Sequence, residues 1–142
     1  MLSLHLGEGF GLEWEQTLYN IDFYETSDGF SDVIELLESL RSKAGSAKDA
    51  RIQYGQLVRY IELLSINGTN LPTDIAKHLC DDIWELRPGF NRVFFFYHEK
   101  DTYVLLHHFR KKSQKTPRRE IDKAIRERED YIARKEKDHE LE

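Results

Sequence analysis

The fold is decided by residues 83–112, which read IWELRPGFNRVFFFYHEKDTYVLLHHFRKK. Three segments of this stretch, Ile83–Leu86, Arg92–His98 and Thr102–Phe109, are rich in the aromatic and branched side chains that favour β-strands. Short turn sequences separate them, so the stretch predicts a three-stranded antiparallel meander. Because the segments are apolar at nearly every position, we expect both faces of these strands to be at least partly covered.

A short strand and a helical hairpin are expected before this meander. Residues 21–26 alternate apolar and polar side chains, which predicts the strand. Ser31 is suited to cap a first helix that ends at Gly45, and the apolar stripe continues through a second helix to Asn67-Gly68. The segment Thr73–Leu79 is expected to form at most one or two turns of helix.

A last helix is expected to start near Pro117, and its apolar positions recur at helical spacing up to Tyr131. Residues 136–142 are then expected to form a charged tail. Residues 1–20, in which glycines alternate with acids, are expected to form an irregular arm. The order β-α-α-β-β-β-α predicts an α+β domain over residues 21–135. We expect its N-terminal strand and helices to pack on one side of an antiparallel sheet.

Length and composition fit a folded, soluble domain. The chain has 142 residues, of which 39% are hydrophobic and 33% charged, and no apolar run approaches the ~20 residues that span a membrane. The first residues lack the basic segment of a signal peptide, so we expect a cytoplasmic protein without a membrane partner. The single cysteine, Cys80, excludes an intrachain disulfide.

The net charge of −5 is unevenly distributed. Acids dominate residues 1–50, whereas residues 102–119 contain six lysines and arginines and no Asp or Glu. Such a basic stretch suits a partner that carries phosphate groups. A solvated face of mixed charges is an equally frequent explanation for a basic cluster.

Cations are expected to gather at one end of the meander. Arg87 ends its first strand, Arg92 begins the second, and Arg110, Lys111 and Lys112 follow the third. Arginine donates paired hydrogen bonds to phosphate, and lysine offers a mobile point charge. Ion pairs with nearby carboxylates are the alternative for these side chains.

RNA can be cleaved without a metal when a base removes the 2′-hydroxyl proton and cations stabilise the five-coordinate phosphorus. Strand alternation places His108 on the face of Leu106 and Arg110, and His107 on the opposite face. We favour His108 as the proton-transfer group because it shares its face with a cation. A hydrogen-bonded packing role is the alternative for either histidine.

Other side chains complete this candidate site. Arg92 is suited to stabilise the phosphorane, and Lys111 and Lys112 to neutralise phosphate or to act as base or acid. Three aromatic side chains are candidates for stacking on an unpaired base, although core packing is commoner for aromatic residues in strands: Tyr97, Tyr103 and Phe109.

Several other chemistries find no support in the sequence. The chain lacks the glycine-rich nucleotide-binding loops, the GxSxG elbow and the HExxH zinc motif. Asp81 and Asp82 point in different directions and have no matching carboxylate cluster. We therefore expect neither a metal nor another cofactor.

Three parts of the chain together resemble the phage-derived HigB-like branch of the RelE/ParE toxin superfamily: Trp84–Arg87, Asn91–Tyr97 and Val104–Ala124. The block from His107 to Ala124 is the most specific part of this resemblance. That branch shows a pattern close to ELR, xxRxxY/F and LLHxFxKKTxKTPxxEIxxA. The resemblance covers about residues 21–135 and implies a RelE-like fold.

The resemblance also implies a function. Proteins of this kind are toxins of type II toxin–antitoxin systems, and in this family they usually cleave mRNA on the ribosome and are silenced by an antitoxin with a helix-turn-helix domain. Arg92 matches the strand arginine thought to stabilise the phosphate, and Arg87 matches the arginine of ELR. Lys111 and Lys112 match the lysine pair.

The sequence thus predicts a metal-independent endoribonuclease. The expected catalytic residues are Arg92, His108, Lys111 and Lys112. The expected RNA-binding residues are Arg87, Arg110, Lys115, Arg118 and Arg119. Two alternatives remain open, a ParE-like inhibitor of gyrase and a non-catalytic module whose basic patch docks an acidic partner.

Overall fold

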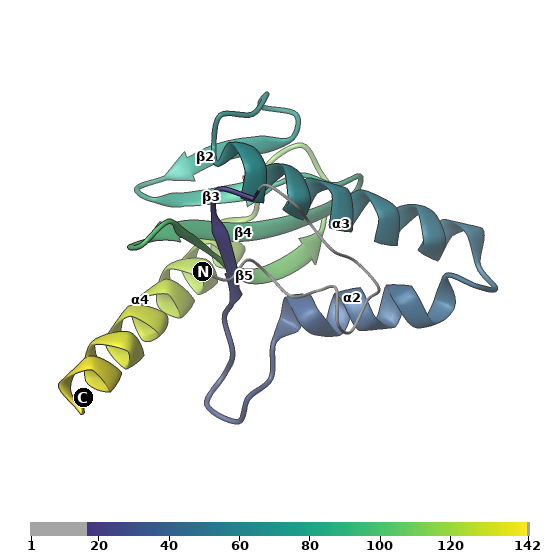
Figure 1. Cartoon of the computed structure of the whole chain (residues 1–142). Coiled ribbons are helices and arrows are strands. Elements are labelled where there is room, and N and C mark those ends of the chain that lie inside the picture. The colour runs from purple at the N-terminus through teal and green to yellow at the C-terminus, as the bar shows by residue number, and fades with distance from the viewer. Residues whose placement is uncertain (1–16, 142) are drawn as a thin grey trace.

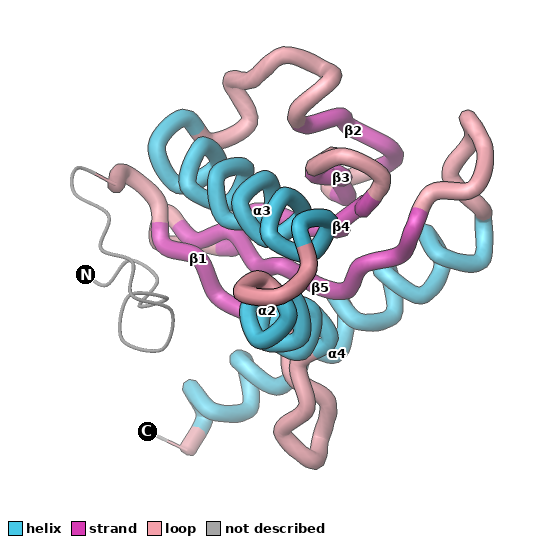
Figure 2. Tube along the Cα trace, turned by 90° about the vertical axis from the view of Figure 1, so that its right-hand side faces the viewer, coloured by secondary structure: helices cyan, strands magenta, loops and turns pink. Residues whose placement is uncertain are grey.

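The computed structural model describes residues 17–141, so most of the expected N-terminal arm lies outside the described residues. Within this range a five-stranded sheet carries helices on both faces (Figure 1). Helices α2 (Asp32–Lys43) and α3 (Lys48–Asn67) cover one face, and α4 (Arg118–Glu140) covers the other. Figure 2 shows β5 running between α3 and α4.

The sheet is mixed and has the order β1-β5-β4-β3-β2. Its strands are β1 (Asn20–Phe23), β2 (Ala76–Cys80), β3 (Ile83–Leu86), β4 (Asn91–His98) and β5 (Thr102–Arg110). β1 runs parallel to β5, and all other neighbours are antiparallel. The predicted meander of β3, β4 and β5 is therefore confirmed, as is the α+β class.

The segment Thr73–Leu79 contradicts its prediction, because residues from Ala76 onward form β2 instead of a short helix. β2 pairs with β3 at the edge of the sheet, and its side chains Lys77 and His78 are exposed. A polar edge strand carries little apolar alternation, so pairing with β3 decides its structure rather than local preference. The element order therefore contains one more strand than expected.

The expectation that the helices lie on one side of an antiparallel sheet is also wrong. Alternate side chains of β4 and β5 pack against α2 and α3 on one face and against α4 on the other. Strands that are apolar on both faces must be covered on both faces. The continuous apolar runs therefore correctly indicated that both faces of the strands are covered. The expectation of helices on one side only was incorrect.

The helix boundaries follow the predicted local signals. The Ser31 hydroxyl caps α2 by accepting a hydrogen bond from the Ile34 backbone N–H at 3.2 Å. α3 ends at Gly68, whose φ of 59° favours glycine and where a Cβ atom would lie 2.9 Å from the Tyr103 hydroxyl. α4 begins after Pro117 and continues to Glu140, so most of the expected tail is helical.

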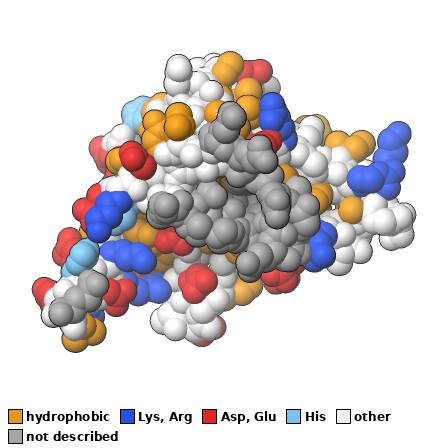
Figure 3. All heavy atoms as spheres, viewed as in Figure 1, with side chains coloured by type: hydrophobic (Ala, Val, Ile, Leu, Met, Phe, Trp, Pro, Cys, Tyr) orange, Lys and Arg blue, Asp and Glu red, His pale blue; other side chains and the backbone are white. Residues whose placement is uncertain are grey.

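Charged side chains of both signs lie along the C-terminal half of α4 (Figure 3). Tyr24 and Tyr131 connect this helix to the N-terminal part of the domain, because their hydroxyls donate to Asp130 and Asp22 at 2.7 and 2.6 Å.

Within residues 17–141, no helix has the length and apolar character needed to cross a membrane.

A bulge in β5 changes which side chains share a face. The pairing passes from Val93 opposite His108 to Phe95 opposite Leu105, so Leu106 and His107 together oppose a single residue of β4. Leu106 and His107 both face α4, whereas His108 faces α2. The predicted shared face of His108 and Leu106 is therefore wrong, because simple alternation fails at the bulge.

Candidate functional site

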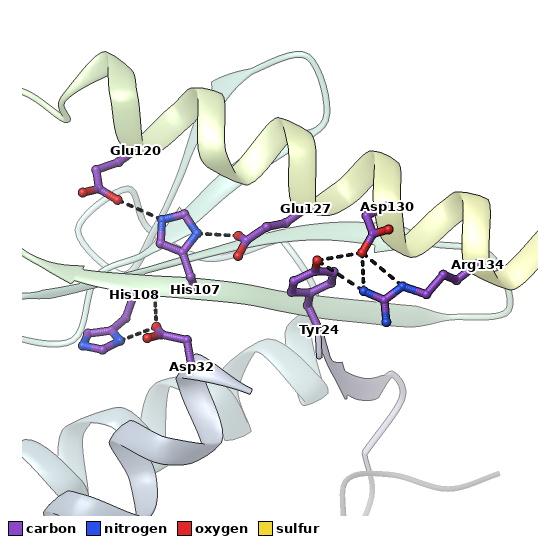
Figure 4. Close-up of polar contacts among 8 residues, drawn as sticks. All are labelled: Tyr24, Asp32, His107, His108, Glu120, Glu127, Asp130 and Arg134. Atoms are coloured by element: carbon purple, nitrogen blue, oxygen red, sulfur yellow. Dashed lines mark hydrogen bonds and ion pairs between the residues drawn. The ribbon is translucent and has the colours of Figure 1, made fainter. Parts of the chain in front are cut away.

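The two adjacent histidines of β5 point to opposite faces of the sheet, and each contacts carboxylates (Figure 4). His107 is only 1% exposed. Its Nδ1 lies 2.5 Å from Glu127 Oε1 and its Nε2 lies 2.9 Å from Glu120 Oε1. Both ring nitrogens of the buried histidine thus contact carboxylates of α4, and the three side chains form one polar cluster against this helix.

His108 forms the second pair. Its Nδ1 lies 2.5 Å from Asp32 Oδ2, and the same oxygen accepts the His108 backbone N–H at 2.7 Å. Asp32 stands in the first turn of α2, where the helix dipole favours a carboxylate. The His108 side chain is 25% exposed, and within the described residues its Nε2 forms no hydrogen bond. A carboxylate on one nitrogen orients the ring and leaves the other nitrogen available for proton transfer.

Asp32 makes the stability of this pair depend on pH. Partial burial acts to raise the pKa of Asp32, but the hydrogen bonds from His108 outweigh it, so the pKa lies below its ordinary value. A carboxyl with a lowered folded pKa stabilises above its unfolded pKa of about 3.9, and this contribution is lost as pH falls through the folded pKa.

We expect Asp32→Asn to lower the free energy of unfolding by about 2 kcal/mol at neutral pH, because it removes a charged acceptor. The difference from wild type should shrink below about pH 4. Urea unfolding of both proteins at about pH 7 and about pH 3 measures it. An unchanged difference at the two pH values would contradict ionic coupling between Asp32 and His108.

An open basic surface follows β5. We define the basic block as Arg110, Lys111, Lys112, Lys115, Arg118 and Arg119. All of these side chains are exposed except Lys111, which is half-buried. Arg118 lies 3.0 Å from Asp122, whereas the side chains of Lys112 and Lys115 form no ion pair with the part of the chain that the structure describes. Arg119 lies 3.9 Å from Glu120, so the uncompensated cations of the block include Lys112 and Lys115 but neither Arg118 nor Arg119.

A cavity of about 270 Å³ lies within this surface and is lined in part by Lys112, Arg119 and Glu120. Glu120 connects the cavity to the buried His107 cluster. Sequence reasoning did not single out Glu120 and Glu127 as partners of His107. Their spacing of seven residues places both on one face of α4, and this signal was available.

Arg87 and Arg92 differ from the basic block in their surroundings, because both contact the buried Glu85 carboxylate. Arg92 is 6% exposed, and its Nη1 donates to the backbone carbonyls of Gly89 and Asn91 at 2.8 and 2.9 Å. Its Nε lies 3.9 Å from the buried Glu85 carboxylate. Burial and the neighbouring Arg87 lower the pKa of Arg92, and Glu85 opposes them.

Arg87 completes this internal group. Its Nε lies 3.5 Å from the same Glu85 oxygen, and its Nη1 donates to the Thr73 carbonyl at 3.0 Å. Thr116 donates to the other Glu85 oxygen at 3.0 Å. Arg87 and Arg92 thus neutralise a buried carboxylate, whereas the cations after β5 face solvent.

The candidate stacking residues are placed differently from one another. Tyr103 is buried in the core, and the partly buried Phe109 stacks on Phe94 with ring centroids 5.5 Å apart. Tyr97 is exposed at the far end of β4. Sequence reasoning missed the most exposed of the described phenylalanines, Phe90, although a bulky apolar residue directly after Pro88-Gly89 is a signal for an exposed turn.

Acidic residues near β2 are engaged with other groups. Asp82 accepts from Arg128, and the His78 ring contacts the Asp81 carbonyl at 2.6 Å. In residues 17–141 no group of three or more His, Cys, Asp and Glu side chains is arranged to hold a metal ion.

The mixed sheet with helices on both faces is consistent with the RelE-like class of α+β proteins. Residues 47–129 match the family described as phage-derived protein Gp49-like (DUF891). The match spans more than half of the chain, so the protein belongs to the Gp49-like family. That family is part of the RelE/HigB-like toxins, and a toxin-like role follows at this coarse level. No curated protein matches the chain.

Proposed function

We propose that the protein is the toxin of a type II toxin–antitoxin system and acts as a metal-independent endoribonuclease on mRNA bound to the ribosome. The observation that carries the proposal is the Asp32–His108 pair, in which the Nε2 atom of His108 stays free. His108 lies in β5, the strand that leads into the basic block. Family membership supports the toxin role. An oriented histidine on a strand that leads into uncompensated cations supplies the groups that RNA cleavage requires.

In this proposal His108 Nε2 takes the proton of the 2′-hydroxyl, and Asp32 is a positioning residue that holds the ring. The 2′-oxygen then bonds to phosphorus while the bond to the 5′-oxygen breaks. Lys111 and Lys112 stabilise the negative charge, and the Lys112 ammonium gives a proton to the leaving oxygen. The products are a 2′,3′-cyclic phosphate and a 5′-hydroxyl end.

The remaining basic side chains bind the RNA backbone in this proposal: Arg110, Lys115, Arg118 and Arg119. Arg87 and Arg92 act from inside the domain by holding Glu85 and the turn that follows β3. We expect a helix-turn-helix antitoxin to cover the basic block when the toxin is silent. The exposed cations of the block favour contact with an acidic surface of this partner.

Expression of the protein in bacteria tests the proposal. We expect wild type to arrest growth and to produce new mRNA 5′ ends in primer extension. His108→Gln and Lys112→Ala should each reduce cleavage at least about 100-fold, because each removes a proton-transfer group. Lys77→Ala is the matched control, since Lys77 is an exposed lysine on the edge strand β2.

The alternatives give different results in the same experiment. Growth arrest with intact mRNA, retained in His108→Gln, would replace the proposal with a gyrase-directed toxin. New mRNA ends that persist in His108→Gln and Lys112→Ala would contradict the assigned site. The absence of both growth arrest and cleavage would favour a non-catalytic module.

A further inference from the structure

Phe90 is a large aromatic side chain that the fold holds in solvent. It lies after Gly89, whose φ is +62°, in the turn between β3 and β4 and is 67% exposed. The turn is fixed on both sides, because Asn91 N–H donates to the Pro88 carbonyl at 3.1 Å and Lys111 N–H donates to the Phe90 carbonyl at 2.7 Å. The ring is therefore presented on a rigid backbone.

A guanidinium group lies against this ring. Arg110 is centred 5.6 Å from the Phe90 ring centroid, within the range of a cation–π contact. Its Nη1 donates to Gln53 Oε1 at 3.3 Å, and Gln53 donates in turn to Asp49 at 2.7 Å. Gln53 is thus a positioning residue, and the other donors of Arg110 remain available to a ligand.

We propose that Phe90 and Arg110 form a binding site for one unpaired nucleobase of single-stranded RNA, which rests on the proposed function and adds to it a base-stacking subsite. The base stacks on the Phe90 ring, and Arg110 binds the adjoining phosphate. The strand then continues along the cations of the basic block. Aromatic rings next to a cationic track are the common means of binding single strands, because every base offers a π-face.

An acidic protein partner would account for the cations but not for the aromatic ring. A carboxylate-rich surface gains nothing from stacking on a phenyl face, whereas a nucleobase supplies both the flat ring and the adjoining negative charge. The pairing of Phe90 with Arg110 therefore favours RNA over an acidic peptide.

Tyr97, in the strand that follows Phe90, provides a matched comparison. It lies near the other end of β4 and is 47% exposed, but its hydroxyl contacts the Asp101 carboxylate at 3.3 Å. An exposed aromatic beside an acid is unsuited to a phosphate-bearing ligand. Binding through stacking should therefore depend on Phe90 and not on Tyr97.

Fluorescence anisotropy with the purified full chain tests this site. The probe is a labelled 2′-O-methyl oligouridine of about twelve nucleotides, which cannot be cleaved because it lacks the 2′-hydroxyl. We expect Phe90→Ala to weaken binding about 5- to 100-fold, the range for loss of one stacked base. Phe90→Trp should bind as tightly as wild type or more tightly, and Tyr97→Ala should bind as wild type.

A second probe isolates the base. With an oligonucleotide of the same length in which abasic sugars replace all bases, Phe90→Ala and wild type should bind equally, whereas Lys112→Ala should still weaken binding. Phe90→Ala binding the oligouridine as tightly as wild type would overturn the inference. An equal loss for Phe90→Ala and Tyr97→Ala, or an equal loss with the abasic probe, would also overturn it.

The inference and the proposed function can fail separately. Phe90-dependent binding of the oligouridine in a protein that leaves mRNA intact would retain the base site and refute the cleavage. mRNA cleavage by a protein whose binding ignores Phe90 would retain the cleavage and refute the base site. An acidic peptide that binds in a Phe90-independent manner and displaces the oligouridine would assign the surface to a protein partner instead.

Discussion

Replacing His107 with leucine is expected to lower the free energy of unfolding by about 3–5 kcal/mol. The loss arises because Glu120 and Glu127 would still point at this position while the group that separates their charges would be gone. His107 is buried, so water cannot take the place of its ring. Urea unfolding of the purified variant at neutral pH, followed by intrinsic fluorescence, measures the change.

Two controls separate the buried cluster from a general effect of losing a histidine. His98→Leu should cost less than about 1 kcal/mol, because His98 lies 4.0 Å from the exposed Glu99. Adding Glu120→Gln and Glu127→Gln to His107→Leu should recover more than half of the lost stability, since both of these partly buried carboxylates are then removed. A small effect of His107→Leu alone would contradict a stabilising contact between His107 and the two glutamates.

Arg92→Met is expected to lower the free energy of unfolding by about 2–4 kcal/mol. The substitution leaves the carbonyls of Gly89 and Asn91 without their donor and removes one cation from the buried Glu85. Thermal and urea unfolding measure the loss.

The neighbouring arginine supplies the control for this variant. Arg87→Met should have a smaller effect, because Arg87 is only half-buried and because Arg92 and Thr116 still contact the Glu85 carboxylate after the substitution. An Arg92→Met protein that is as stable as wild type but no longer cleaves mRNA would return Arg92 to the substrate-binding role that the family resemblance implies.

Local signals in the sequence were sufficient for the helices and for most of the sheet. The Ser31 cap and the Asn67-Gly68 terminator act within a few residues of the helix ends, so their meaning does not depend on tertiary structure. The strands of the meander are marked by long apolar runs. β2 lacks such a run, and its structure depends on pairing with β3, which a local pattern cannot reveal.

The site was predictable only where alternation holds. His108 and Arg110 lie two residues apart beyond the bulge and share a face as expected, and the structure shows that this face carries the helical hairpin. The Asp32 carboxylate that holds His108 comes from α2, 76 residues earlier in the chain. The burial of Arg92 likewise depends on a Glu85 carboxylate from the preceding strand, and charge alone does not distinguish such an arginine from an exposed one.

The parallel pairing of β1 with β5 has a consequence for the order of folding. Asn20 lies opposite Thr102, so β1 pairs with a strand that is synthesised about 80 residues later. Contacts between distant parts of a chain close large loops and therefore form slowly. A nascent chain that stops before residue 102 contains β1 and the helical hairpin of α2 and α3, but it lacks His107 and His108. The basic block therefore reaches its folded place only when nearly the whole domain has been made.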